Sequence, residues 1–387
     1  MIRFYTAGES HGQGLVVIIE GIPSGLSVDV EYINKELKKR QSFYGRGKRM
    51  LIEEDKVKII SGIRGGKTLG SPVSFFIENK DWENWREQMD PLKLSPHPPV
   101  SRPRPGHADL AGAFKFGVKD LRNISERASA RETAARVAAG SLCKLLLQEF
   151  GINIWGWVEE IGGIKVPWED MGREEIKVNL TRSDILCPDP EREKEIVALL
   201  KEIEKEGDTV GGKFVIVISG VPPGLGSFTQ WEKRLDARLC FSLMSIPGIK
   251  GVEVGDGFSL SCKRGSEAMD EIFLKEGKIV RGSNHMGGIE GGISNGEDII
   301  LKAVMKPIPT LRKPLRSIDL ISGEETKAQV ERGDVCAVPS ACVIGESMVA
   351  IEIASQLKEK FGGDSLKEMK ANFNNYLNSL KENFYYG

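Results

Sequence analysis

The sequence predicts a mixed αβ protein whose two halves share one strand-and-helix pattern. The first observation is a repeat: GLVVIIEGIPSGL at residues 14–26 reappears as KFVIVISGVPPGL at 213–225. In each copy a β-branched strand ends at a Gly/Pro turn, and a segment of helical character follows, at 30–40 and 229–244. No Ser/Gly-rich or charged linker divides the chain, so we expect one domain over residues 1–387 with two-fold pseudo-symmetry. Chance similarity of two short strand–turn units is the alternative.

The other elements follow from local patterns. Residues 70–77 have the character of a strand, and residues 91–105 carry six prolines, which exclude regular structure and predict a stiff extended loop. An amphipathic helix is predicted over 129–150, where Ser-Ala-Arg-Glu has the form of a capping box. Two further helical stretches, at 346–361 and 364–384, have mixed charge, which indicates packing or subunit contact.

Composition excludes several classes of protein. The chain has 387 residues, 40% of them hydrophobic, and a formal net charge of −1. It can bury a large core, and its balanced charge disfavours bulk nucleic-acid binding, which needs many cations. Six cysteines form no CxxC pair, which is typical of reduced thiols in a cytoplasmic protein. No signal peptide and no run of membrane-spanning length is visible, so we expect neither export nor membrane insertion.

Four polar loops indicate a site for a small polyanion. The first, GESHGQG at 8–14, places a carboxylate, a hydroxyl and an imidazole between glycines, which let backbone N–H groups approach a ligand. Three more, at 40–49, 102–109 and 126–136, load arginine or histidine into glycine-, proline- or serine-rich stretches. Guanidinium groups match carboxylates and phosphates, and three or four of them hold a multiply charged ligand despite the entropy lost on association.

His11 is the principal candidate for chemistry. It lies in a loop rather than on an apolar face, so a core histidine is the less persuasive interpretation. A protonated imidazole neutralises a departing phosphate, and Ser10 orients the same oxygens. Ser129 is an N-cap, part of an anion site at a helix N-terminus, or both. The cationic run at 38–49 has a structural alternative to ligand binding, because the helix dipole favours cations near a helix C-terminus. This alternative does not account for Arg46 and Arg49, which lie in the glycine-containing loop beyond the helix.

Two nucleotide motifs and a metal site are excluded. Residues 61–68 (SGIRGGKT) lack the first glycine of a P-loop and precede a strand. The segment Gly12-Gln-Gly14 lacks the third glycine of a dinucleotide fingerprint, and it too precedes a strand. The chain has four histidines without clustered ligands, which argues against a metal centre.

Four segments carry a family pattern: GESHG at 8–12, ERASARET at 126–133, GGIEGGIS at 287–294 and RGDV at 332–335. Together they resemble chorismate synthase, and the resemblance runs nearly end to end. It implies an α+β fold, a β-α-β sandwich with helices between two four-stranded antiparallel sheets, assembled as a homotetramer. It also implies 1,4-elimination of phosphate from 5-enolpyruvylshikimate-3-phosphate to give chorismate, with reduced FMN required although the reaction has no net redox change.

The resemblance assigns roles residue by residue. His11, with Ser10 and Ser129 beside it, would protonate or stabilise the leaving phosphate, His107 would stabilise the reduced flavin, and Asp334 would act with flavin N5 in removing the ring proton. The implied substrate-binding residues are Arg40, Arg46, Arg49, Arg104, Arg131 and Arg332. The implied flavin contacts are Arg127, Ala128, Ser129, Pro247, Gly248, Gly291, Lys306, Pro307, Ile308, Pro309, Thr310 and Arg332. Arg40 and Arg46 also correspond to nicotinamide-nucleotide contacts in some relatives. The resemblance therefore implies NADPH only as a source of electrons.

The chain departs from the family pattern at three places. Gly333 stands where relatives carry serine or histidine, Ser340 where arginine is usual, and Pro247-Gly248 where Asn-Ala is common. For Asp334, a surface Arg-Gly-Asp turn is the alternative. A non-catalytic binder of phosphorylated metabolites or RNA is the alternative function. The sequence leaves open whether the chain reduces its own flavin with NADPH, although the lack of long insertions favours dependence on an outside reductase.

Overall fold

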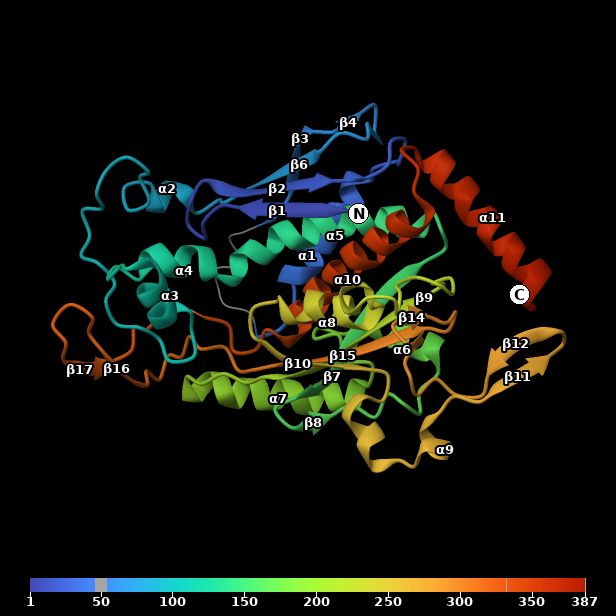
Figure 1. Ribbon diagram of the computed structural model, residues 1–387. Helices are drawn as coiled ribbons and strands as arrows, with labels where there is room; N and C mark the ends of the chain where they lie inside the picture. Colours follow the sequence, from blue (N-terminus) through green and yellow to red (C-terminus); the bar gives the residue numbers. More distant parts are fainter. Residues whose placement is uncertain (46–53, 332, 387) are drawn as a thin grey trace.

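Two antiparallel sheets enclose a layer of helices (Figure 1). The computed structural model describes residues 1–45, 54–331 and 333–386. The first sheet has the order β1-β2-β6-β3, with β1 at Arg3–Ala7, β2 at Gly14–Glu20, β6 at Val73–Glu78 and β3 at Val57–Ser61. The second has the order β10-β15-β9-β7-β8, with β10 at Ile249–Val254, β15 at Ile299–Met305, β9 at Gly212–Ser219, β7 at Asn153–Ile161 and β8 at Ile164–Lys165.

Four helices fill the space between the sheets: α1 (Val30–Gln41), α5 (Thr133–Gln148), α8 (Leu235–Met244) and α10 (Val338–Phe361). Helix α5 contacts β2 and β6 of the first sheet, α10 contacts β7 and β9 of the second, and the two helices pack on each other. Within the described chain, α10 is the one helix long and apolar enough to cross a membrane, but 94% of its apolar window is buried. It is therefore the core helix of the sandwich.

The two sheets share a strand order. In each half the chain runs strand, strand, helix, strand, strand, helix, which is β1-β2-α1-β3-β6-α5 and then β7-β9-α8-β10-β15-α10. The repeated segments form β2 and β9, which take the same place in their sheets. The expectation of two four-stranded sheets is wrong for the second one. There the chain reverses at Gly162 and Gly163, both with positive φ, and the two-residue β8 pairs with the end of β7.

Smaller elements surround this sandwich. Four two-stranded ribbons are β4 with β5 (Ile63–Arg64, Lys67–Thr68), β11 with β12 (Ile272–Lys275, Lys278–Arg281), β13 with β14 (Ile289–Glu290, Ile293–Ser294) and β16 with β17 (Arg316–Ile318, Glu325–Lys327). The peripheral helices are α2 (Trp82–Trp85), α3 (Asp109–Phe116), α4 (Arg122–Ala128), α6 (Arg173–Leu180), α7 (Pro190–Glu206), α9 (Gly265–Ala268) and α11 (Leu366–Phe384). Short 3₁₀ turns are η2 (Ala130–Glu132), η3 (Trp231–Lys233) and η4 (Gly257–Cys262).

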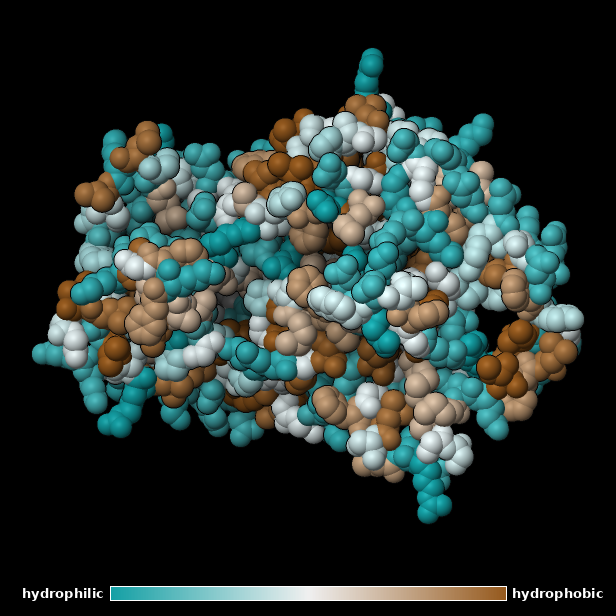
Figure 2. All heavy atoms as spheres, viewed as in Figure 1, coloured by the Kyte–Doolittle hydropathy of each residue, from teal (hydrophilic) through white to brown (hydrophobic). Residues whose placement is uncertain are grey.

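Apolar side chains are exposed on the β11–β12 ribbon and on the first sheet, among other places. The β11–β12 ribbon projects from the body as a largely hydrophobic arm (Figure 2), on which Ile272 and Leu274 are exposed. On the outer face of the first sheet, Tyr5 and Ile18 lie opposite each other in the register, and both are exposed. A two-stranded ribbon is at best marginally stable in water, so the arm is a natural element for contact with another chain.

Helix α5 begins later than predicted. The Ser129 Oγ accepts a hydrogen bond from the backbone N–H of Arg131 (3.3 Å) and so caps η2, after which α5 starts at Thr133. The capping-box prediction is wrong, because the Glu132 carboxylate pairs with Arg136 one turn ahead, at 2.6 Å from its Nε, instead of reaching back to the cap. The result is a turn with the Ser129 hydroxyl at its start, close to the β1–β2 loop.

Helices α5 and α10 approach each other closely at Gly140, where an added Cβ would lie 2.5 Å from the Cα of Ser347. We expect Gly140→Ala to lower the free energy of unfolding by about 2 kcal/mol in urea titrations. Overpacking against a backbone costs about 1–3 kcal/mol, more than the gain of up to ~1 kcal/mol from better helix propensity. The control is Gly265→Ala in α9, where a Cβ meets open space. Equal losses in the two variants would contradict the tight contact between α5 and α10.

Candidate functional site

The predicted polar loops at 8–14, 102–109 and 126–136 gather at one end of the sandwich, where α2, α3 and α4 lie beside the loop between β1 and β2 (left in Figure 1). Backbone hydrogen bonds fix this loop to α4, because the N–H of Ser10 donates to the carbonyl of Glu126 at 3.0 Å. The N–H of His11 donates to the Glu126 carboxylate at 2.7 Å. The loop that carries the predicted chemistry is therefore held by a helix from over a hundred residues further along the chain.

A serine–histidine cluster forms at this junction from Ser10, His11, Glu126 and Ser129. The Ser129 Oγ donates to the Ser10 Oγ at 3.1 Å, and the His11 Nδ1 lies 2.8 Å from one Glu126 oxygen. The Ser10 side chain is buried and His11 keeps 20% of its surface exposed. The two hydroxyls contact each other, and the imidazole of the next residue in the loop contacts Glu126. Their role as an oxyanion site stays a prediction.

Helix α2 covers the imidazole with an indole ring. The ring centroids of His11 and Trp85 are 4.0 Å apart, and the Arg122 guanidinium lies 5.0 Å from the indole centroid. The Trp85 Nε1 donates to Asp81 at 2.9 Å, which anchors the ring. The apolar ring shields one side of the histidine from water.

Beside this cluster lie two buried arginines that share one carboxylate. An Arg40 Nη lies 2.9 Å from one Asp55 oxygen, and Arg131 bonds the other. Arg131 also donates to Asn79 at 2.9 Å. Burial alone would raise the pKa of Asp55, but the charges of both arginines outweigh it and lower the pKa. Two guanidiniums thus converge on one buried carboxylate, and guanidinium groups are the side chains that best match carboxylates and phosphates.

A second cluster surrounds Arg104. Its guanidinium contacts Asp109 at 2.8 Å, Glu331 at 3.0 Å and the hydroxyl of Thr310 at 3.3 Å. The Nδ1 of His107 lies 2.5 Å from Asp109. Burial works against ionisation of Asp109, but hydrogen bonds from the histidine and from Arg104 hold the pKa of that carboxyl well below its usual range. His107 is therefore held at one ring nitrogen.

Several predicted flavin segments meet at the Arg104 cluster. The backbone N–H of Lys306 donates to the carbonyl of Gly248 at 3.0 Å, and its ammonium donates to the carbonyl of Gly106. Residues 306–310 therefore lie between the Pro247-Gly248 turn and the loop of His107. Arg127, by contrast, binds the β1–β2 region, donating to the carbonyl of Thr6 at 2.9 Å.

The segment that leads into α10 connects the Arg104 cluster with the pair Arg40 and Arg131. The Ser340 Oγ donates to the carbonyl of Arg40 at 2.8 Å, and the Val335 N–H donates to the carbonyl of Gly45 at 2.8 Å. A Cβ on Gly333 would lie 3.0 Å from the carbonyl oxygen of Thr310. Asp334 is thus carried on a segment that runs from the Arg104 cluster to the shared arginines. Serine at 340, where the family usually has arginine, fixes the end of α1.

One predicted contact lies apart and three lie outside the described residues. Gly291 lies in the β13–β14 turn. The carbonyl of the next residue, Gly292, accepts a hydrogen bond from the N–H of Leu235 at the start of α8, whereas Pro247 follows the end of that helix. A helix of that length separates them by about 15 Å. The predicted flavin contact of Gly291 stays a prediction. Arg46, Arg49 and Arg332 lie outside the described residues, and their roles stay predictions.

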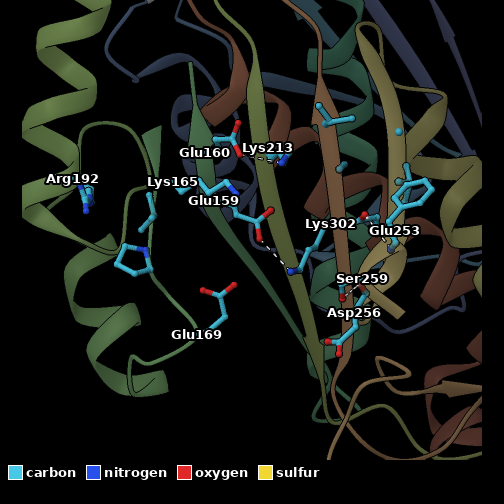
Figure 3. A pocket seen from close by; sticks show the side chains of 17 residues that line it. Glu159, Glu160, Lys165, Glu169, Arg192, Lys213, Glu253, Asp256, Ser259 and Lys302 are labelled. Atoms are coloured by element: carbon cyan, nitrogen blue, oxygen red, sulfur yellow. Dashed lines mark hydrogen bonds and ion pairs between the residues drawn. The ribbon is translucent and has the colours of Figure 1, made fainter. Parts of the chain in front are cut away.

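A groove of about 780 Å³ on the outer face of the second sheet is a separate feature (Figure 3). Five carboxylates and four cationic side chains line it, and they largely neutralise one another: Lys302 lies 3.2 Å from Glu159 and Lys213 lies 3.0 Å from Glu160. None of the predicted site residues lines it. Without excess positive charge the groove does not suit a polyanion.

Sequence reasoning missed the residues that orient the predicted ones. Glu126 and Asp109 stand inside the motifs, and a carboxylate next to histidine or arginine was a signal that could have assigned them a role. Trp85, Asp55 and Asn79 have no such signal, because their partners are distant in sequence and only the fold brings them together.

Comparison with known proteins identifies the family of the chain. The family model described as chorismate synthase matches residues 2–357. The chain is 52% identical over 386 residues to the chorismate synthase of Desulforudis audaxviator, which covers 99% of each chain. It is 51% identical over 391 residues to that of Geotalea daltonii, covering 98% of this chain and 100% of the relative. A solved structure, "Crystal Structure of Chorismate Synthase", aligns with a TM-score of 0.80 at 41% identity over 98% of both chains. The chain therefore belongs to the chorismate synthase family, the phosphate lyases that form chorismate in the shikimate pathway to aromatic amino acids.

Proposed function

We propose that this chain eliminates phosphate from 5-enolpyruvylshikimate-3-phosphate between the serine–histidine cluster and the Arg104 cluster. The observation that carries the proposal is the pair Arg40 and Arg131, nearly buried and brought together at Asp55. Guanidinium groups suit a substrate with one phosphate and two carboxylates. In the reaction the C–O bond breaks with its electron pair on the phosphate, a ring C–H bond loses its proton, and a ring double bond forms.

The residues around Lys306 fit an anionic cofactor. The pKa of Lys306 is lowered by burial and by the neighbouring charge of Lys250, a repulsion that a phosphate or a reduced flavin would relieve. Glycines 106 and 248 have positive φ, so at these turns the backbone can approach a flat ring without a side chain in between. We assign reduced FMN to this region, where Arg127, Ala128 and Ser129 contribute from α4 and Pro307, Ile308, Pro309 and Thr310 from the facing segment. When bound, the reduced flavin supplies electron density that assists C–O cleavage.

Residues of the chain protonate and bind the departing phosphate and take part in removing the ring proton. His11 gives its proton to the departing phosphate, and the hydroxyls of Ser10 and Ser129 hold the phosphate oxygens. Asp334 takes part in removing the ring proton, and His107, held by Asp109, supplies a hydrogen bond beside the flavin. Indole cover by α2 keeps water from the histidine.

We further propose that the chain is a single domain of two related halves that works as a homotetramer in the cytoplasm. The common strand order of the two sheets supports the first point. The exposed apolar surfaces on β11–β12 and on the outer face of the first sheet support self-association.

An anaerobic assay with the full chain tests the proposal. We expect phosphate release from the enolpyruvyl substrate when chemically reduced FMN is supplied, and none with oxidised FMN plus NADPH, since the chain resembles members that depend on an outside reductase. Phosphate in the second tube would show that the chain reduces its own flavin. No phosphate in either tube, together with substrate binding, would favour a non-catalytic binder.

A further inference from the structure

The contacts between His11 and Glu126 form an arrangement to which the family resemblance assigns no role. One carboxylate receives two groups of the same residue: its Oε2 accepts the backbone N–H of His11 at 2.7 Å, and its Oε1 lies 2.8 Å from Nδ1 of the ring. The backbone contact fixes the loop, and the ring contact fixes the imidazole about its own axis. A single side chain thus determines both where the histidine stands and which nitrogen is engaged.

The surroundings of this pair keep the Glu126 carboxylate ionised. Glu126 is 5% exposed, and Arg122, one turn earlier on α4, donates to its Oε1 at 3.2 Å. Burial raises the pKa of Glu126, but the hydrogen bonds and charge of His11 outweigh burial, and the pKa is lowered. On the other side α2 presents the neutral Trp85 ring, with Asp81 behind it, and the loop's own Glu9 is exposed. A stable carboxylate in contact with an imidazole stabilises the imidazolium.

We propose that Glu126 is a positioning residue that holds the His11 ring by Nδ1, so that the proton given to the departing phosphate leaves from Nε2. With the ring charged, His11, Arg122 and Glu126 carry one net positive charge, which suits a phosphate dianion. After transfer the neutral ring keeps its remaining proton on Nδ1, in the hydrogen bond to the carboxylate. This inference rests on the proposed role of His11 as proton donor.

The same carboxylate also supports the loop, so the test must separate positioning from structure. Glu126→Gln keeps the shape and removes the charge. The matched control is Glu352→Gln, which removes a largely buried carboxylate paired with Arg238 on α8, remote from the site. Both variants are compared with wild type in the anaerobic assay with reduced FMN, for kcat, KM and the pH dependence of kcat.

We expect Glu126→Gln to lower kcat at least about 10-fold with KM changed less than about 3-fold, and Glu352→Gln to leave both unchanged. The limb on which kcat falls as pH rises should move to lower pH by about one unit or more, because the imidazolium loses its anionic partner. In a His11→Ala background, Glu126→Gln should cost nothing further. A wild-type pH limb and kcat in Glu126→Gln, beside an inactive His11→Ala, would overturn this inference and leave the proposed function intact. An active His11→Ala would overturn the role of His11 itself.

A measurement on the wild-type chain covers the case in which the glutamine variant does not fold. The chain has only four histidines, so the imidazole ¹⁵N signals of His11 can be assigned by comparison with His11→Ala. Because Nδ1 lies against the carboxylate, the proposal requires Nδ1 of His11 to carry a proton. A neutral ring with its proton on Nε2 alone would contradict it.

Discussion

His11→Ala should lower kcat for phosphate release by roughly 100-fold or more, the scale of a lost general acid. The phosphate must then leave without a proton from the imidazole, while Arg40 and Arg131 still bind the substrate's anionic groups. The effect should therefore fall on kcat much more than on KM. Anaerobic stopped-flow measurement of phosphate with reduced FMN and the enolpyruvyl substrate checks this.

The matched control is His97→Ala. His97 is exposed in the proline-rich loop, where its backbone N–H contacts Ser95, so this change should leave kcat within about 2-fold of wild type. Turnover of His11→Ala equal to that of the control would remove the histidine from the mechanism and revive the non-catalytic alternative.

Asp55→Ala should lower the free energy of unfolding by about 3–5 kcal/mol, because it leaves Arg40 and Arg131 buried without their common partner. Urea titrations measure the loss, and Asp170→Ala, at an exposed position, should change stability by less than about 0.5 kcal/mol. A loss at Asp55 no larger than this control would show that the two arginines need no buried counter-charge.

The stabilisation by Asp55 also has a defined pH dependence. The folded state lowers the pKa of this carboxyl below its ordinary value of 3.8. Its contribution is thus complete above about pH 4–5 and is lost as the pH falls through the lower folded pKa. The difference in unfolding free energy between wild type and Asp55→Ala should shrink as the pH falls below about 4. A constant difference across that range would contradict the ionised cluster.

Elements with a strong local signal could be predicted from the sequence. Helix α1 begins at the predicted residue 30, β6 falls on the predicted strand at 70–77, and residues 91–105 form no helix or strand. The final helix is capped at Ser365, whose hydroxyl accepts the N–H of Glu368 at 3.2 Å.

Elements set by tertiary contacts were misplaced or missed. Helix α8 begins at Leu235 instead of 229, because residues 231–233 form a 3₁₀ turn before it. Helix α10 begins at Val338, eight residues before the predicted start at 346, since its first turns are buried against the rest of the helix layer and lack the polar face that marks a helix. Strand β1 has no strong apolar alternation and forms by pairing with β2.

In the candidate site, too, some residues have a local sequence signal and others are placed only by tertiary contacts. Ser10, His11 and Arg131 could be identified because each lies in a short motif whose residue types already indicate anion chemistry. Their partners could not, since Arg131 reaches Asp55 and Asn79 across 76 and 52 residues. The pairing of β3 with β6, which carries Asp55 beside Asn79, and the packing of α5 on β6 bring those side chains together.

The most direct test of the central claim is a crystal structure of the chain with FMN and the enolpyruvyl substrate. The account predicts the substrate phosphate within hydrogen-bond distance of His11 and Ser10, with Arg40 and Arg131 on its anionic groups and the flavin ring between His107 and residues 306–310. Substrate bound in the groove of the second sheet (Figure 3), or a phosphate with no contact to His11, would contradict it.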